Sequence, residues 1–323
     1  MHGQSALDGL LDSSNSATPG KSVTIEGSHP SPHLGVVRGD DSPLAPELLL
    51  AVERLRGSEP LELPGDRPRP PVLGRERRTD VVVLSPELVA ALEERALVLG
   101  ATLELSLLAT LELLLARYSG QSQFVLGALL ESDHRAAPAG IRTPRLVRSD
   151  LSAATTFAEL QPQVRAACEA AEADLDLDFE QLVRALAGSG DPSRRPLFQV
   201  LFCASHGCTL EPDGFAAPDL TLRIAHEGAQ VAVRLECAGA LFEPATIARM
   251  AQNYRTLLEG IAQEPELGLM QLPLVHVDEL RLLASLNETE LALPPVEAAF
   301  TSSSQCRRCV HPSESRWSMV MGA

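Results

Sequence analysis

Short apolar runs alternate along the chain with longer segments of helical spacing. The run VVVL at 81–84 predicts a buried strand, and residues 85–99 have the spacing of a helix that Ser85 caps. A second helix is expected over 102–118, where leucine occupies nearly every face, as in a helix that is buried all round. FVLGALL at 124–130 predicts another buried strand.

The pattern then continues with helices and three further strands. Helices are expected over 156–173 and 179–186, and Pro162 should kink or shorten the first of them. Strands are expected over 197–204, 219–225 and 229–238, and a long amphipathic helix over 243–263. Helices that alternate with strands and give way to paired strands predict a mixed α/β sandwich.

The two flanks lack this regularity. Residues 1–43 are rich in Ser, Gly, Pro and His and predict a disordered arm. Residues 44–57 have a short helix pattern, and five prolines within 60–78 predict an extended connector. After Pro295 the composition changes abruptly, and we expect an unstructured tail that is an out-of-frame end of the coding sequence.

Composition excludes several classes of function. A net charge of −16 argues against a nucleic-acid partner, which needs a basic face. No signal peptide and no apolar run of bilayer-spanning length is found, so we expect a cytoplasmic protein without a membrane partner. The six cysteines are then expected to be reduced thiols. CRRCVH at 306–311 offers three zinc ligands but no fourth with the right spacing, so no metal is predicted.

Residues 191–197, DPSRRPL, place two adjacent arginines between a turn and an apolar run. They resemble the Arg-Asp-x-Ser-Arg-Asn-Pro-Leu motif of the condensation domains of non-ribosomal peptide synthetases. The family's Asn is Arg195 here, and its first Arg is Gly190. Further blocks resemble the family in the same order: LELPGDRPRPP (61–71), LLARYSGQSQFVLG (114–127), DFEQLVRAL (178–186), ALFEPATIARMAQNYRTLLEGI (240–261) and LPLVHVDELRLLASLNETE (272–290).

This resemblance implies one lobe of a two-lobed fold. Such domains resemble two chloramphenicol-acetyltransferase-like lobes, and the matching blocks belong to the C-terminal lobe and its hinge. The implied fold is an α/β sandwich lobe with a mixed, largely antiparallel sheet and disordered termini. We divide the chain into a disordered arm (1–43), a helix with a Pro-rich hinge (44–78), the C-terminal lobe (79–283), and a linker with an unstructured tail (284–323).

The resemblance also implies a reaction and partners. Condensation domains join an acyl or peptidyl thioester to an amine, both tethered by phosphopantetheine on carrier domains, and give an amide. The family's catalytic motif is His-His-x-x-x-Asp-Gly, which belongs to the other lobe. None of the eight histidines here is followed four residues later by Asp; the nearest similarity is HGQSALDG at 2–9. We therefore predict no catalytic residue and no directly bound cofactor in this chain.

The matching lobe departs from the family at several positions. Where an arginine is expected after the Val-Gly strand, the chain has Asp133, with Arg135 two positions later. AGIRTPRLV at 139–147 lacks the family's Phe and Asn, and DLDLDFE at 174–180 keeps only part of another block.

Two interpretations of the arginine pair remain open. In the first, Arg194 and Arg195 face the cleft and contact a phosphate of a pantetheine arm. In the second, Asp191 and Ser193 form a turn, and Arg194 pairs with a local carboxylate such as Glu180 to fix the start of the strand. The candidate site, structural or in the cleft, comprises Glu180, Asp191, Ser193, Arg194 and Pro196.

Three functional hypotheses follow. The first is a truncated, inactive condensation-domain chain that exposes an apolar patch and dissolves poorly when isolated. The second is a non-catalytic module that binds a carrier domain or a complementary half-domain. The third is a complete acyltransferase that uses another base, such as His134 or His206, although neither has a carboxylate at the family's spacing.

Overall fold

The computed structural model describes residues 45–130, 144–172, 177–186, 191–204, 215–227 and 230–288. Several sequence-based expectations lie outside these ranges: the disordered arm, the tail with CRRCVH, positions 133–135, and His206.

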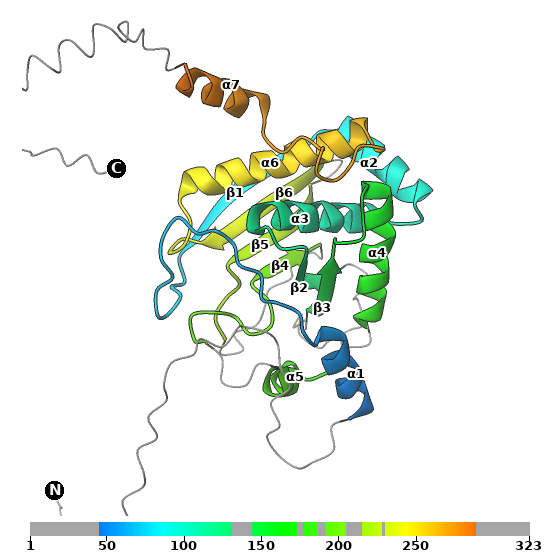
Figure 1. The fold of residues 1–323 in the computed structure, drawn as a ribbon, viewed down its shortest axis with the longest axis vertical. Coiled ribbons are helices and arrows are strands. Elements are labelled where there is room, and N and C mark those ends of the chain that lie inside the picture. Colours follow the sequence, from blue (N-terminus) through cyan, green and yellow to red (C-terminus); the bar gives the residue numbers. More distant parts are fainter. Residues whose placement is uncertain are drawn as a thin grey trace, which may run out of the picture.

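One six-stranded sheet forms the centre of the molecule (Figure 1). Its strands are β1 (Arg77–Leu84), β2 (Gln123–Leu129), β3 (Arg145–Asp150), β4 (Val200–Cys203), β5 (Leu220–Glu227) and β6 (Gln230–Ala238). They lie in the order β1-β6-β5-β4-β2-β3. Strand β4 pairs in parallel with both of its neighbours, and the other pairings are antiparallel. This confirms the predicted mixed, largely antiparallel sheet.

Seven helices accompany the sheet in the described part of the chain. They are α1 (Pro46–Leu55), α2 (Pro86–Val98), α3 (Leu103–Ser119), α4 (Phe157–Ala170), α5 (Phe179–Leu186), α6 (Pro244–Gln263) and α7 (Val277–Leu286). The larger core cluster joins one face of the sheet to α2, α3, α4 and α6. Helix α3 is central and buries ten consecutive residues, as its leucine-rich pattern predicts.

The opposite face of the sheet is covered at the β2, β3 and β4 end. Because side chains alternate between the faces of a strand, Phe124 and Leu126 join the larger core, whereas Val125 and Leu129 point the other way. The latter pack against α1 and α5, which form a second, smaller cluster. Figure 1 shows these two helices together at the end of the molecule farthest from α7.

Local signals in the sequence explain where several helices begin and end. The Ser85 hydroxyl accepts the Leu88 N–H, and the Thr102 hydroxyl accepts the Leu105 N–H, both at 3.3 Å. Gly120 ends α3 with φ at 74°, a left-handed conformation that favours glycine. These caps confirm the predicted helix boundaries to within a few residues.

Several boundaries differ from the prediction: β4 is Val200–Cys203 and not 197–204, and α4 ends at Ala170 and not at 173. Strand β1 begins at Arg77, because Arg77 pairs with Ala238 and extends the ladder beyond the apolar VVVL run. Helix α4 runs without a break from Phe157 to Ala170 through Pro162. Since Pro162 lies five residues after the first helical residue, its missing N–H removes one hydrogen bond, to the carbonyl of the fourth preceding residue.

No single helix in the described ranges has the length and hydropathy of a bilayer-spanning segment. Within these ranges, only helices α2 and α3 taken together have this length and hydropathy, and the two helices are bent by 97° relative to each other.

Glycine at position 127 is required by the packing between β2 and the start of β4. A methyl group added at Gly127 would lie 2.8 Å from Cε2 of Phe198. We expect Gly127→Ala to lower the free energy of unfolding by about 1–3 kcal/mol, because the Phe198 ring must move out of the smaller core. Urea unfolding measures this loss. Gly74→Ala is the control, since a methyl group there meets no atom within 4 Å; equal losses in the two variants would contradict the expectation.

Candidate functional site

The segment 191–194 forms a turn that is closed by its own side chains. Asp191 Oδ1 accepts hydrogen bonds from the Ser193 N–H at 2.8 Å and the Ser193 hydroxyl at 2.7 Å. The Arg194 N–H donates to the Asp191 carbonyl at 3.0 Å. The Ser193 hydroxyl, then its backbone N–H, lower the pKa of Asp191, because both donate to the charged carboxylate. This part of the motif therefore builds a local turn.

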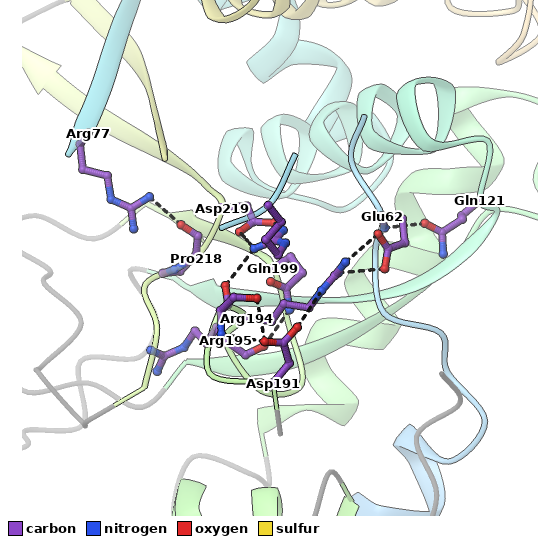
Figure 2. A network of polar contacts seen from close by, with 11 residues as sticks. Glu62, Arg77, Gln121, Asp191, Arg194, Arg195, Gln199, Pro218 and Asp219 are labelled. Atoms are coloured by element: carbon purple, nitrogen blue, oxygen red, sulfur yellow. Dashed lines mark hydrogen bonds and ion pairs between the residues drawn. The ribbon is translucent and has the colours of Figure 1, made fainter. Parts of the chain in front are cut away.

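Arg194 extends from this turn to the Pro-rich connector (Figure 2). Its guanidinium makes a two-point contact with Glu62, at 2.8 and 3.0 Å, and Nε lies 3.8 Å from Asp191 Oδ2. The expected pairing with Glu180 is wrong, because Glu180 instead pairs with Arg184 at 2.9 Å, one helical turn along α5. Glu180 therefore forms its ion pair within α5 and not with the other candidate residues.

The connector is held at further points around the same turn. Gln121 accepts the Glu62 N–H at 2.8 Å and donates to the Pro60 carbonyl at 3.0 Å. Arg69 donates to the Ser193 carbonyl at 2.9 Å and makes a two-point ion pair with Asp219. The Asp219 side chain is almost fully buried. The turn, the connector and the start of β5 are therefore joined by charged contacts.

Arg195 has a different environment from Arg194. It is 3% exposed, and its guanidinium lies over the rings of Phe179 and Phe198. Figure 2 shows the Arg194 and Arg195 side chains leaving the backbone in opposite directions. The two adjacent arginines therefore make different contacts: Arg194 pairs with carboxylates, and Arg195 packs on aromatic rings.

Pro196 introduces a tight turn that directs the chain into β4. The Phe198 N–H donates to the Pro196 carbonyl at 3.0 Å, and the intervening Leu197 has φ at 72°. This γ-turn is strained for a leucine, and the surrounding packing must hold it in place. The Gln199 side-chain amide then donates to the Arg195 backbone carbonyl at 2.7 Å. The backbone carbonyl of Gln199 accepts the Asp219 N–H at 2.8 Å.

The described residues hold no group of three metal-binding side chains. Among the histidines, His226 and His276 are described, and His276 Nδ1 accepts the Asp278 N–H at the start of α7. A general base for acyl transfer needs an imidazole close to the reacting amine. The network around Asp191 consists of Asp191, Ser193, Arg194, Glu62, Gln121, Arg69 and Asp219. It can position backbone segments but holds no imidazole.

A separate groove of about 450 Å³ lies between α2, α4 and α6. Its apolar wall includes Val98, Phe157 and Ile261. Arg95, which also lines it, donates to the Ala262 carbonyl at 2.6 Å. The groove lies on the helical side of the molecule, and none of its lining residues belongs to the network around Asp191.

Large apolar side chains are exposed at several places in the described part of the chain, and they are most numerous on α7. Helix α7 buries none of its residues and exposes Val277, Leu280, Leu282, Leu283 and Leu286. Edge strand β1 exposes Val81 and Val83. The exposed apolar side chains are therefore spread over several elements, with the largest group on α7 and a smaller one on β1, and poor solubility stays a prediction.

Sequence comparisons identify relatives over most of this chain. A polypeptide of the linear gramicidin synthase of Brevibacillus parabrevis is 36% identical over 272 residues, which are 78% of this chain and 5% of that polypeptide. Phosphinothricin tripeptide synthetase PhsC of Streptomyces viridochromogenes is 33% identical over 257 residues, which are 73% of this chain and 23% of that protein. The chain thus spans a small part of these relatives.

The fold has solved counterparts as well. The X-domain from teicoplanin biosynthesis is 27% identical with a TM-score of 0.61, over 71% of this chain and 57% of the X-domain chain. The same X-domain has been solved in complex with OxyB, with 28% identity and a TM-score of 0.62, over 71% of this chain and 55% of that chain. The sheet and its helices thus have the chloramphenicol-acetyltransferase-like fold.

The family model of condensation domains matches residues 52–284, from helix α1 to helix α7. The match includes both the network around Asp191 and the connector that it holds. The chain therefore belongs to the condensation domain family of non-ribosomal peptide synthetases.

Proposed function

We propose that this lobe takes part in amide formation between two carrier-tethered substrates. The observation that supports this most is the family match over 52–284, which coincides with one continuous sheet and its helices. In the proposed reaction the amine nitrogen attacks the thioester carbonyl, a C–N bond forms and the C–S bond breaks. The amine loses a proton, and the phosphopantetheine sulfur leaves as the thiolate, which is then protonated.

The lobe would contribute scaffold and substrate contacts to this step. An imidazole that accepts the amine proton would have to come from outside the network around Asp191, which has none. We assign Asp191, Ser193, Arg194 and Pro196 the role of fixing the start of β4 and the connector. Their contacts to Glu62, and to Arg69 through the Ser193 carbonyl, support this role over phosphate binding.

The test uses the purified full chain with two carrier domains, one loaded with an acyl thioester and one with an aminoacyl thioester. We expect no amide from the chain alone, and amide when a second polypeptide bearing His-His-x-x-x-Asp-Gly is added. Mass spectrometry of the acceptor carrier detects the product. Amide formation by the lone chain would contradict the division of roles, and no amide in either mixture would contradict the proposed reaction.

A second candidate function is a non-catalytic docking module. Two observations favour it: the X-domain of teicoplanin biosynthesis, which is similar in fold, is solved in complex with OxyB, and α7 and β1 expose apolar side chains here. Titration of an unloaded carrier domain into the chain separates the candidates. Binding by the chain without amide formation in any mixture supports the docking module.

A further inference from the structure

Two phenylalanine rings lie against the guanidinium of Arg195, and a third phenylalanine contacts one of them. Phe179 begins α5, Phe198 precedes β4, and Phe215 precedes β5. The guanidinium carbon lies 5.0 Å from the centre of the Phe198 ring and 5.3 Å from the centre of the Phe179 ring. Phe215 meets Phe179 edge to face, with ring centres 5.7 Å apart. We name Phe179, Phe198 and Phe215 the aromatic cage.

The cage has the properties of a cation site. Aromatic faces carry negative partial charge and attract cations within about 6 Å, more strongly where water is excluded. Arg195 is 3% exposed, so this attraction acts with little screening. Its Nη1 also donates to the Ala216 carbonyl at 3.3 Å, which places a further negative partial charge beside the guanidinium.

The cage connects segments that are distant along the chain. Phe179 belongs to α5, whose buried face packs against α1 and the sheet. Phe198 packs against Gly127 of β2 in the same smaller core, and Ala216 leads into β5. A cation at the centre therefore contacts the helix, the start of β4 and the segment before β5 at once.

We propose that the aromatic cage is a cation-binding site for guanidinium-type ligands, that Arg195 is its built-in occupant, and that this occupancy holds α5 against the sheet. The inference goes beyond the proposed function and does not depend on it. Arg194 provides the contrast within the same motif, because its charge is satisfied by Glu62 and Asp191 at a partly exposed position.

Chemical rescue of a variant tests the proposal. Arg195→Ala empties the cage and is expected to lower the melting temperature of the full chain by about 8 °C. Guanidinium or methylguanidinium at about 20 mM, far below unfolding concentrations, should raise the melting temperature of this variant by about 2 °C or more. The wild-type protein and Arg194→Ala should show no such rise. An equal response of all three proteins, or no response of the variant, would overturn the proposal.

A second pair of variants covers the case in which the alanine variant does not fold. Arg195→Lys keeps a cation in the cage, whereas Arg195→Met keeps a similar volume without charge. The proposal requires the lysine variant to melt at the higher temperature and to retain more hydrogen-exchange protection over 179–186. Because an uncompensated buried ammonium is costly, a site without cation preference gives the reverse order, and that order would disprove the proposal.

Discussion

Replacement of Asp219 by asparagine is expected to lower the free energy of unfolding by about 3–5 kcal/mol. The Asp219 side chain is 3% exposed and forms a two-point ion pair with Arg69, whose side chain is 20% exposed. The variant leaves the Arg69 charge without its carboxylate in a mostly dry environment. Desolvation of an uncompensated charge is among the costliest single changes in a protein.

Chemical unfolding in urea measures this effect, with Glu180→Gln as the matched control. Glu180 also pairs with an arginine, but both side chains are more than half exposed, so its loss should cost less than about 0.5 kcal/mol. The double variant Arg69→Met/Asp219→Leu removes both charges and should recover part of the loss. Losses of similar size at Asp219 and Glu180 would show that the Arg69 pair does not hold the connector.

Glu112→Gln is expected to stabilise the protein increasingly as the pH rises. Glu112 lies on α3, is 1% exposed, and its Oε1 has no hydrogen-bond partner among the described residues. Burial raises the pKa of Glu112 from 4.5 to about 8, and Ser149 acts in the opposite direction. At neutral pH the folded protein therefore keeps this proton, whereas the unfolded chain releases it.

The sign of the pH dependence follows from proton counting. Between pH 4.5 and about 8 the folded state binds one proton more than the unfolded state, so wild-type stability falls as the pH rises. The full contribution is present below pH 4.5 and is lost as the pH passes the folded-state pKa. At pH 7 the accumulated loss is on the order of 3 kcal/mol.

Urea titrations of both proteins at several pH values test this prediction. The stability of Glu112→Gln minus that of the wild type should grow by about 1.4 kcal/mol per pH unit across this window. Other carboxylates titrate equally in the two proteins, so their effects cancel in the difference. A difference that stays constant with pH would mean that Glu112 is ionised in the folded protein.

The elements that the sequence predicts well are those decided by nearby residues. Ser85 and Thr102 cap their helices because the partners of their hydroxyls lie three residues away. The turn from Asp191 to Arg194 is local in the same way, and DPSRRPL indicates it directly. The leucine-rich pattern of α3 likewise indicates its burial without any knowledge of its neighbours.

The partners that the sequence does not reveal lie far apart along the chain. Arg69 and Asp219 are separated by 150 residues, and Arg194 and Glu62 by 132. Glu180 is close to Arg194 in sequence, but it forms its ion pair with Arg184, one helical turn along α5. The Arg-Pro-Arg-Pro run and the Asp before a strand are the only signals for the Arg69 pair, and neither specifies the other.

The Pro-rich connector and α1 are attached to the rest of the lobe at several points along their length. In addition to the contacts of Arg69 and Glu62, Asp66 accepts the Glu243 N–H at 2.7 Å. Arg54 at the end of α1 donates to the Leu146 carbonyl at 2.7 Å. Residues 46–76 are thus fastened to β3, β5 and α6 instead of forming a loose joint. A pulling force applied at Pro46 would therefore load the sheet directly through α1.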